Sequence, residues 1–247
     1  MGKNKLKKFA EIEQLECVLQ YPREKLLNEG FPFKGKWKSD LYKNDNPIVL
    51  ELGCGKGEYT VGLAKTNPDK NFVGIDIKGA RIWSGAKDVA QQALDNAKFL
   101  RTEIENINHF FDSGEVDEIW ITFPDPQMQK VRKRLTSTRF LNLYSSLLKT
   151  DGVIHLKTDS PFLYEYTRRL VEKNNLDVIE QTDDLYGSGN ADPVKSIKTF
   201  YESQWLSRGK SIKLISFRLN NRENLEEPEA EDIERDNYRA FTRHTPI

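Results

Sequence analysis

The 247-residue sequence contains only two cysteines, Cys17 and Cys54, which are too few for a disulfide framework or a cysteine zinc site. It has no apolar run near the roughly 20 residues that span a bilayer. Its basic start, MGKNKLKKFA, lacks the apolar segment of a secretory signal. We therefore expect a protein of the reducing cytoplasm that is not embedded in a membrane. We also expect no metal, because the histidines are scattered: His109, His155 and His244.

The sequence also lacks a net charge, because 38 basic residues balance 38 acidic residues. The charges are nevertheless segregated: residues 1–8 carry four lysines and no acid, whereas residues 223–236 are rich in acids. A neutral total does not exclude a polyanionic partner, since a local basic patch is sufficient to bind one.

Short apolar segments alternate with longer segments of helical periodicity. The pattern predicts strands at 47–53, 71–77, 97–103, 116–123, 152–159, 176–181 and 211–219. It predicts helices at 57–66, 80–96, 135–149 and 161–173. This alternation is typical of an α/β fold with a mainly parallel sheet covered on both faces. We divide the chain into a basic N-terminal extension with a lead-in helix (1–44), a main domain (45–220) and an acidic C-terminal tail (221–247).

An acidic residue lies at or beside the end of each of the first five predicted strands. In open parallel sheets a ligand binds outside the carboxyl ends of the strands. Acids are common on surfaces, but five at one edge of one sheet predict a polar site. They are Glu51, Asp76, Glu103, Asp125 and Asp159.

The segment ELGCGKGE places Gly53, Gly55 and Gly57 between a strand and a helix. The dinucleotide fingerprint needs a further glycine where Glu58 stands, and Glu51 would repel a phosphate. A ligand with positive charge and hydroxyl groups fits better, which favours S-adenosylmethionine. Asp76 could accept hydrogen bonds from the ribose hydroxyls, and Glu103 from the adenine amine. The alternative is a tight structural turn with solvated acids.

With ITFPDP added, the sequence resembles the bacterial tRNA (guanine-N7-)-methyltransferases over about residues 45–219. The resemblance depends on ELGCGKGE, GIDIKGAR, the FPDP turn with the basic run after it, LKTD and TFYE. It implies a Rossmann-like class I methyltransferase fold, with a seven-stranded sheet that ends in an antiparallel hairpin. It also implies methyl transfer from S-adenosylmethionine to N7 of a guanine in the variable loop of tRNA, at position 46.

The resemblance further assigns residues to the two ligands. It implies that Glu51, Asp76, Glu103 and Asp125 line the cofactor site together with the three glycines. It implies that Asp159 and the 199–202 segment, with Thr199, Tyr201 and Glu202, face the tRNA.

Asp125 is the predicted centre of the active site. N7 of guanine has a free lone pair, so methylation needs in-line placement rather than a base. A carboxylate could support the positive charge that develops on the purine, or it could accept hydrogen bonds from N1–H and the 2-amino group. The sequence leaves both roles open, beside the alternative that Asp125 caps a turn between two prolines.

A basic run follows this turn, with no acid among its members. A phosphate-binding role is favoured over a solvated face, because the run begins just past the predicted site. The family usually has tryptophan after PDP and lysines beyond, whereas this chain has Gln127 and Gln129 there. We expect tRNA contacts from Gln129, Lys130, Arg132 and Arg134, within the run that also includes Lys133 and Arg139.

Other features leave alternatives open. Residues 183–196 are either a flap over the strand ends or a passive insertion. The acidic tail is either docked through Tyr238 and Phe241 or disordered. His155 is expected to be a core histidine. Rival functions are a methyltransferase for another RNA, a small molecule or a protein, an RNA-binding protein on a degenerate fold, and a nicotinamide dehydrogenase. The sequence is compatible with a monomer or a homodimer.

Overall fold

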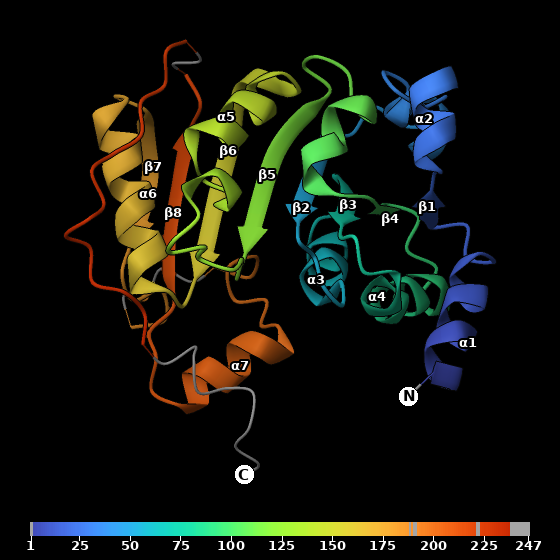
Figure 1. Cartoon of the computed structure of the whole chain (residues 1–247). Helices are drawn as coiled ribbons and strands as arrows, with labels where there is room; N and C mark the ends of the chain where they lie inside the picture. The colour runs from blue at the N-terminus through green and yellow to red at the C-terminus, as the bar shows by residue number, and fades with distance from the viewer. Residues whose placement is uncertain (1, 188, 190–191, 221–222, 238–247) are drawn as a thin grey trace.

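The computed structural model describes residues 2–187, 189, 192–220 and 223–237. Within them, one sheet contains eight strands in the order β1-β4-β3-β2-β5-β6-β8-β7 (Figure 1). The strands are β1 (Val18–Gln20), β2 (Ile48–Leu52), β3 (Asn71–Ile75), β4 (Ala97–Arg101), β5 (Val116–Thr122), β6 (Leu148–Thr158), β7 (Asp177–Thr182) and β8 (Lys213–Arg218).

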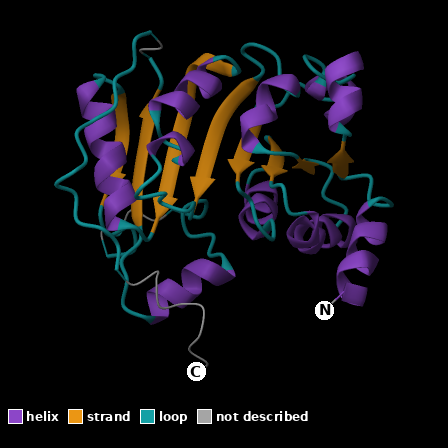
Figure 2. Cartoon of the chain, in the orientation of Figure 1, coloured by secondary structure: helices purple, strands orange, loops and turns teal. Residues whose placement is uncertain are grey.

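Helices cover the sheet and connect its parallel strands (Figure 2). The α-helices are α1 (Gly2–Ile12), α2 (Arg23–Glu29), α3 (Glu58–Thr66), α4 (Gly79–Gln91), α5 (Thr138–Ser145), α6 (Pro161–Lys173) and α7 (Phe200–Ser207). A π-helix, η1 (Trp37–Tyr42), and two 3-10 helices, η2 (Ile104–His109) and η3 (Val131–Lys133), complete the set. No helix in these described residues is both long and apolar enough to cross a membrane.

The strand pairing confirms a mainly parallel sheet with a C-terminal antiparallel hairpin. Only β8 runs antiparallel to its neighbours, β6 and β7. The number of strands was predicted wrongly, because Val18–Gln20 adds an eighth strand parallel to β4. This short strand has no alternating apolar pattern of its own, and it forms through backbone pairing with residues about 80 positions later.

The core follows the alternation of side chains along each strand. Leu50 and Leu52 face the apolar cluster that includes α5 and α6. Val49 and Trp120 face the second cluster, which includes α3, α4 and Trp205 of α7. Because both faces are covered, β2 reads as a continuous apolar run broken only by Glu51, which is itself buried.

The predicted helix at 135–149 was wrong at both ends. The observed helix, α5, is Thr138–Ser145, and β6 already begins at Leu148. Leu147 and Leu148 keep the apolar helical spacing, but Leu148 pairs with Val116 of β5. Tertiary strand pairing therefore overrides the local pattern.

Candidate active site

The carboxyl ends of β2 to β6 lie at one edge of the sheet, since these strands are parallel. A cavity of about 470 Å³ opens there, between the ends of β2, β3 and β4 and the loop after β5. This size is within the range of small-molecule sites. Its lining includes Gly53, Asp76, Glu103, Gln127 and Lys133. The structure thus brings together three of the residues that the sequence assigned to a cofactor.

Asp76 lines this cavity and joins the loops that follow β2 and β3. Its carboxylate accepts hydrogen bonds from the backbone N–H groups of Gly55, at 3.0 Å, and Lys78, at 2.7 Å. A carboxylate has about four acceptor positions, so further donors can still bind to it. Glu103 is exposed at the start of η2, where it accepts a 3.4 Å hydrogen bond from the Asn106 amide. Both carboxylates can therefore accept hydrogen bonds from hydroxyl or amine groups of a ligand.

The glycines of the loop serve different purposes. Gly53 has a φ of +76° and is exposed, and no atom lies within 4 Å of the position that a Cβ would occupy. At Gly57 a Cβ would lie 2.5 Å from the Phe99 ring and 3.2 Å from the Cα of Gly85. Gly53 thus leaves open space beside the loop, whereas Gly57 permits close packing of α3 and α4 on β4.

Glu51 does not lie at the mouth of the site, where the sequence placed it. Its side chain is buried beneath the glycine loop and accepts hydrogen bonds from Thr60 N at 2.8 Å, from the Thr60 hydroxyl and from the Thr122 hydroxyl at 2.6 Å. Burial raises the pKa of this carboxyl to about 7. Glu51 ties α3 to β5 and so fixes the loop from below.

Asp125 is exposed in a turn whose backbone is strained on both sides. Phe123 and Gln127 each have a φ of +48°, which is unusual for residues with side chains. The Asp125 carboxylate accepts a 3.0 Å hydrogen bond from Gln127 N, so it does cap the turn. The remaining acceptor positions stay open to solvent next to Gln127, which lines the cavity. Strain of this kind is concentrated at functional sites.

The basic run divides into exposed and buried members. Gln129, Lys130 and Arg132 are exposed and can contact a ligand. Arg134, expected among the tRNA contacts, is instead 2% exposed.

The partners of Arg134 explain its burial. Its guanidinium donates to the carbonyls of Gln127, at 3.2 Å, and Met128, at 2.8 Å. The same group lies 4.8 Å and 4.4 Å from the ring centroids of Phe162 and Tyr166. Arg134 therefore holds the turn that contains Asp125 against α6.

The TFYE segment forms the first turn of α7 rather than an exposed polar surface. Thr199 and Glu202 cap the helix reciprocally. Glu202 is fully buried and pairs with the equally buried ammonium of Lys157, at 2.9 Å. Asp159, which was also expected to face the substrate, is 1% exposed. Within this segment Phe200 and Tyr201 are exposed, and the Tyr201 ring lies 6.5 Å from that of Phe123.

Sequence reasoning assigned no role to Lys157, although it lies in the quoted LKTD motif. Besides Glu202, its ammonium donates to the carbonyls of Lys195, at 2.7 Å, and Ile197, at 3.0 Å, and to the Tyr186 hydroxyl, at 3.3 Å. Burial lowers the pKa of Lys157, and Glu202 opposes this shift. The cluster fastens the segment before α7 onto the end of β6. A lysine inside a predicted parallel strand was the available signal, since such positions are normally apolar.

The acidic tail docks along α6, as far as the structure describes it (Figure 1). Glu227 accepts from Thr138 N at 2.9 Å and from the Tyr166 hydroxyl. Asp236 accepts from the Ser160 hydroxyl and from Phe162 N at 3.2 Å. The residues proposed as anchors from the sequence, Tyr238 and Phe241, lie outside the described residues.

His155 is a structural residue, as expected. Its ring stacks on Trp120, at 4.1 Å between centroids, and its Nδ1 lies 2.7 Å from the Ser216 hydroxyl. Its Nε2 lies 3.3 Å from a carboxylate oxygen of Glu118. Across the described parts of the chain, no group of three or more histidine, cysteine or acidic side chains is arranged to hold a metal ion.

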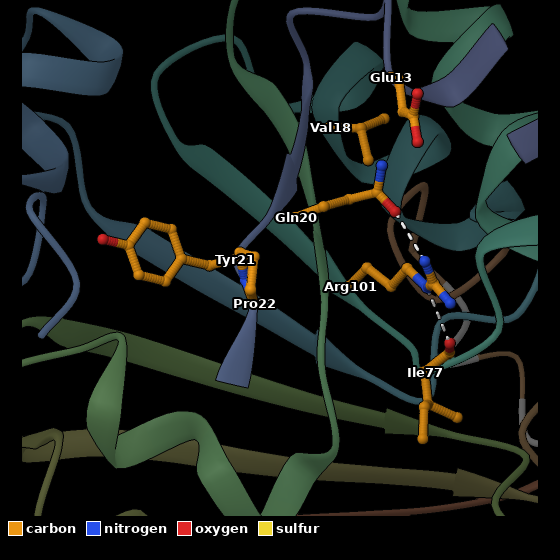
Figure 3. A pocket seen from close by; sticks show the side chains of 7 residues that line it. All are labelled: Glu13, Val18, Gln20, Tyr21, Pro22, Ile77 and Arg101. Atoms are coloured by element: carbon orange, nitrogen blue, oxygen red, sulfur yellow. Dashed lines mark hydrogen bonds between the residues drawn. The ribbon is translucent and has the colours of Figure 1, made fainter. Parts of the chain in front are cut away.

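A second cavity, of about 580 Å³, lies beside the first (Figure 3). Arg101 crosses it and donates to the Gln20 amide oxygen, at 2.8 Å, and to the Ile77 carbonyl, at 3.3 Å. Its guanidinium also lies 4.8 Å from the Phe9 ring centroid. Arg101 thus joins β1, β4 and α1, and of the residues that line this cavity only Ile77 also lines the first.

The sheet order, the glycine turn after β2 and the acids after β3 and β4 define a class I S-adenosylmethionine-dependent methyltransferase. Solved structures agree on the fold. A 16S rRNA methyltransferase is 16% identical, with a TM-score of 0.57 over 73% of this chain and 91% of that chain. An antibiotic-related methyltransferase is 15% identical, with a TM-score of 0.56 over 82% and 96%.

The sequence comparisons are more specific. A family model described as a putative methyltransferase matches residues 45–215. A tRNA (guanine-N(7)-)-methyltransferase of Porphyromonas gingivalis is 58% identical over 94% of this chain and 96% of its own length. Another, of Bacteroides fragilis, is 54% identical over 98% and 96%. The chain belongs to the tRNA (guanine-N(7)-)-methyltransferase family.

Proposed function

We propose that this protein transfers a methyl group from S-adenosylmethionine to N7 of the guanine at position 46 in the variable loop of tRNA. The observation that carries the proposal is the exposed carboxylate of Asp125, held in a strained turn next to the cavity lined by Gly53 and Asp76. The relatives in Porphyromonas gingivalis and Bacteroides fragilis are named for guanine-N7 methylation of tRNA.

The cavity fits the cofactor. Gly53 leaves space for close approach of a ligand, and Asp76 retains acceptor positions for the two ribose hydroxyls. Glu103 can accept from the adenine amine, and the basic side chain of Lys133 lies across the same cavity. When bound, S-adenosylmethionine supplies an electrophilic methyl group on a positively charged sulfur. Gly55, Gly57 and Glu51 support this site from below rather than line it.

The residues of this chain need only place the base, because N7 carries a free lone pair and no proton has to be removed first. Placement alone can account for a large part of a rate enhancement. Asp125 either accepts hydrogen bonds from the guanine N1–H and 2-amino groups or stabilises the positive charge that the purine gains. Arg134 keeps the Asp125 turn fixed through the carbonyls of Gln127 and Met128.

The tRNA backbone would meet the exposed part of the basic run. Gln129, Lys130 and Arg132 are the proposed contacts, and each lysine or arginine that neutralises a phosphate steepens the salt dependence by about 0.7–0.9 in log–log slope. Tyr201 and the first turn of α7 would face the base, and Thr199, Glu202 and Asp159 would support that turn from beneath.

We place the reaction in the cytoplasm, where the unpaired thiols of Cys17 and Cys54 stay reduced. Residues 45–220 form the proposed catalytic domain, between the basic N-terminal segment (1–44) and the acidic tail (221–247).

The test is methyl transfer from radiolabelled S-adenosylmethionine to two unmodified tRNA transcripts, one with guanine and one with adenine at position 46. We expect label on the guanine transcript alone, with strand scission at that position after borohydride and aniline. Equal labelling of both transcripts would refute the assigned target. Cofactor binding without any labelling would favour another RNA, a small molecule or a protein as substrate.

An inosine transcript distinguishes the two possible roles of Asp125, because inosine lacks the 2-amino group of guanine but keeps N7. We expect Asp125→Ala to lower kcat/KM by about 10- to 100-fold, the usual effect of losing a hydrogen bond to a charged group. If Asp125 binds the 2-amino group, the variant and the inosine substitution will not be additive. Additive losses would instead favour charge stabilisation. Unchanged kcat/KM in Asp125→Ala would exclude both roles.

A further inference from the structure

Two neighbouring aromatic rings are exposed at the start of α7. The exposed fraction is 58% for Phe200 and 42% for Tyr201. Figure 1 shows α7 beyond the tips of β5 and β6, the edge that carries the proposed active site. Single exposed apolar residues are common on proteins, so the surroundings of these two rings decide whether they have a function.

The two rings lie over different loops of the site. The N–H of Phe200 donates to Glu58 at the start of α3, at 3.0 Å, and Lys56 of the glycine loop lies 4.7 Å from its ring centroid. The Tyr201 ring instead contacts Phe123 of the Asp125 turn and is supported by Trp205, at 5.5 Å between centroids. One helical turn therefore spans the glycine loop and the Asp125 turn.

Three cations accompany the aromatic side chains of this region, where Glu58 is the acid that accepts from the Phe200 N–H. Lys56, Lys198 and Arg208 are exposed. Lys198 lies 4.7 Å from the Tyr186 ring centroid, and Arg208 lies 5.2 Å from that of Trp205. Among the residues that the structure describes, none of the three cations forms an ion pair. Exposed rings interleaved with unpaired cations are typical of surfaces that bind single-stranded nucleic acid by base stacking and phosphate contact.

We propose that Phe200 stacks on the nucleobase next to the methylated guanine, and that Lys56 contacts the phosphate between the two nucleotides. The assignment rests on the proposed function, since it places the guanine itself between Tyr201 and Asp125. Phe200 is pre-organised for this role, because its backbone is held by Glu58 and the first turn of α7 is fixed by its capping box. Bases in RNA loops can be unstacked and bound against an aromatic ring in this way.

The experiment measures tRNA binding and methylation by Phe200→Leu, Phe200→Trp and Lys56→Gln. Leucine keeps an apolar side chain but has no ring face, whereas tryptophan keeps one. We expect Phe200→Leu to raise the Kd for tRNA by about 5- to 150-fold, which corresponds to the usual contribution of one stacked base. Phe200→Trp should bind within a few-fold of the wild type. Lys56→Gln should reduce the log–log salt slope by about 0.7–0.9.

Ile179→Ala is the matched control, because Ile179 is 47% exposed on β7 and lies away from the strand ends. Its Kd for tRNA should equal that of the wild type. The Phe200 variants should bind S-adenosylmethionine with wild-type affinity, which separates a lost base contact from a damaged site. A transcript with 5-iodouridine beside the guanine should crosslink to the wild type at Phe200.

Wild-type tRNA affinity in Phe200→Leu would overturn the proposal while leaving the proposed function intact. So would an equal loss in the leucine and tryptophan variants, since that pattern indicates packing rather than stacking. A wild-type protein that methylates no tRNA overturns the proposed function itself, and the two failures are thereby distinguishable.

Discussion

The buried ion pair between Lys157 and Glu202 makes a sharp prediction about stability. Both side chains are fully buried, and the two charged groups are 2.9 Å apart. Replacing Lys157 with methionine keeps most of the volume but removes the charge. It leaves the Glu202 carboxylate buried without its cation, and it removes the donor to the carbonyls of Lys195 and Ile197. Breaking one side of a buried pair in this way costs about 3–5 kcal/mol.

The expected change in Tm follows from the size of the protein. For a domain of this length, 1 kcal/mol shifts Tm by about 2–4 °C. Lys157→Met should therefore lower Tm by about 6–20 °C, as measured by calorimetry. Hydrogen exchange should accelerate most in α7 and in the segment that Lys157 holds, because these contacts fasten that segment to β6.

A double variant tests the cause. In Lys157→Met with Glu202→Leu no unpaired charge remains, so Tm should recover at least half of the loss. Full recovery is not expected, because Glu202 also completes the cap of α7 and accepts from Tyr186, at 2.6 Å. Lys25→Met is the control, since the Lys25–Glu29 pair is exposed and should contribute less than about 1 kcal/mol. A loss of under 2 °C in Lys157→Met, or a double variant less stable than the single one, would refute the reasoning.

Two further predictions concern the residues beneath the site. Because the pKa of Glu51 is raised from 4.5 to about 7, the folded protein holds a proton that the unfolded chain releases, and stability falls as pH rises through this window. The loss of unfolding free energy is about 3 kcal/mol, and the Glu51→Gln variant should not show it. The measurement is the urea midpoint at pH 4.5 and at pH 8. A wild-type midpoint that is the same at both pH values would contradict this prediction. Arg134→Met should lower kcat/KM about 10-fold or more with little change in the Kd for S-adenosylmethionine, because the variant no longer holds the Asp125 turn in place. If the variant loses only tRNA affinity, Arg134 is instead a phosphate contact.

The parts of the fold that depend on local pattern were predictable from the sequence. Strands such as β2 and β3 are short apolar runs bounded by turn residues, and the acids after them meet because parallel strands end at one edge. Asp76 lies at the expected cavity for this reason. By contrast, β1 could not be predicted, since its three residues become a strand only through pairing with β4.

The basic run shows what a linear charge pattern cannot reveal. Lys130, Arg132 and Arg134 look alike in the sequence, yet only the last is buried. Its burial depends on the Phe162 and Tyr166 rings of α6, about 30 residues later, and on carbonyl acceptors in its own loop. Three-dimensional partners of this kind leave no periodic signal in the run itself.

The acids of the family motifs separate into two groups with different physical roles. Asp76, Glu103 and Asp125 keep acceptor positions that face the cavity or solvent. Glu51 and Glu202 are instead saturated by internal donors and hold the glycine loop and the first turn of α7 in place.

This division matches the demands of the proposed chemistry. A reaction that needs no proton removal gains its rate from placement, so rigid support is as important as the groups that contact the ligands. Substitutions of the buried acids, Glu51 and Glu202, should therefore change kcat together with stability. Substitutions of the acids that keep open acceptor positions, Asp76, Glu103 and Asp125, should change ligand binding or kcat without a loss of Tm. The buried carboxylates thus contribute to methyl transfer through geometry, although neither touches a reacting atom.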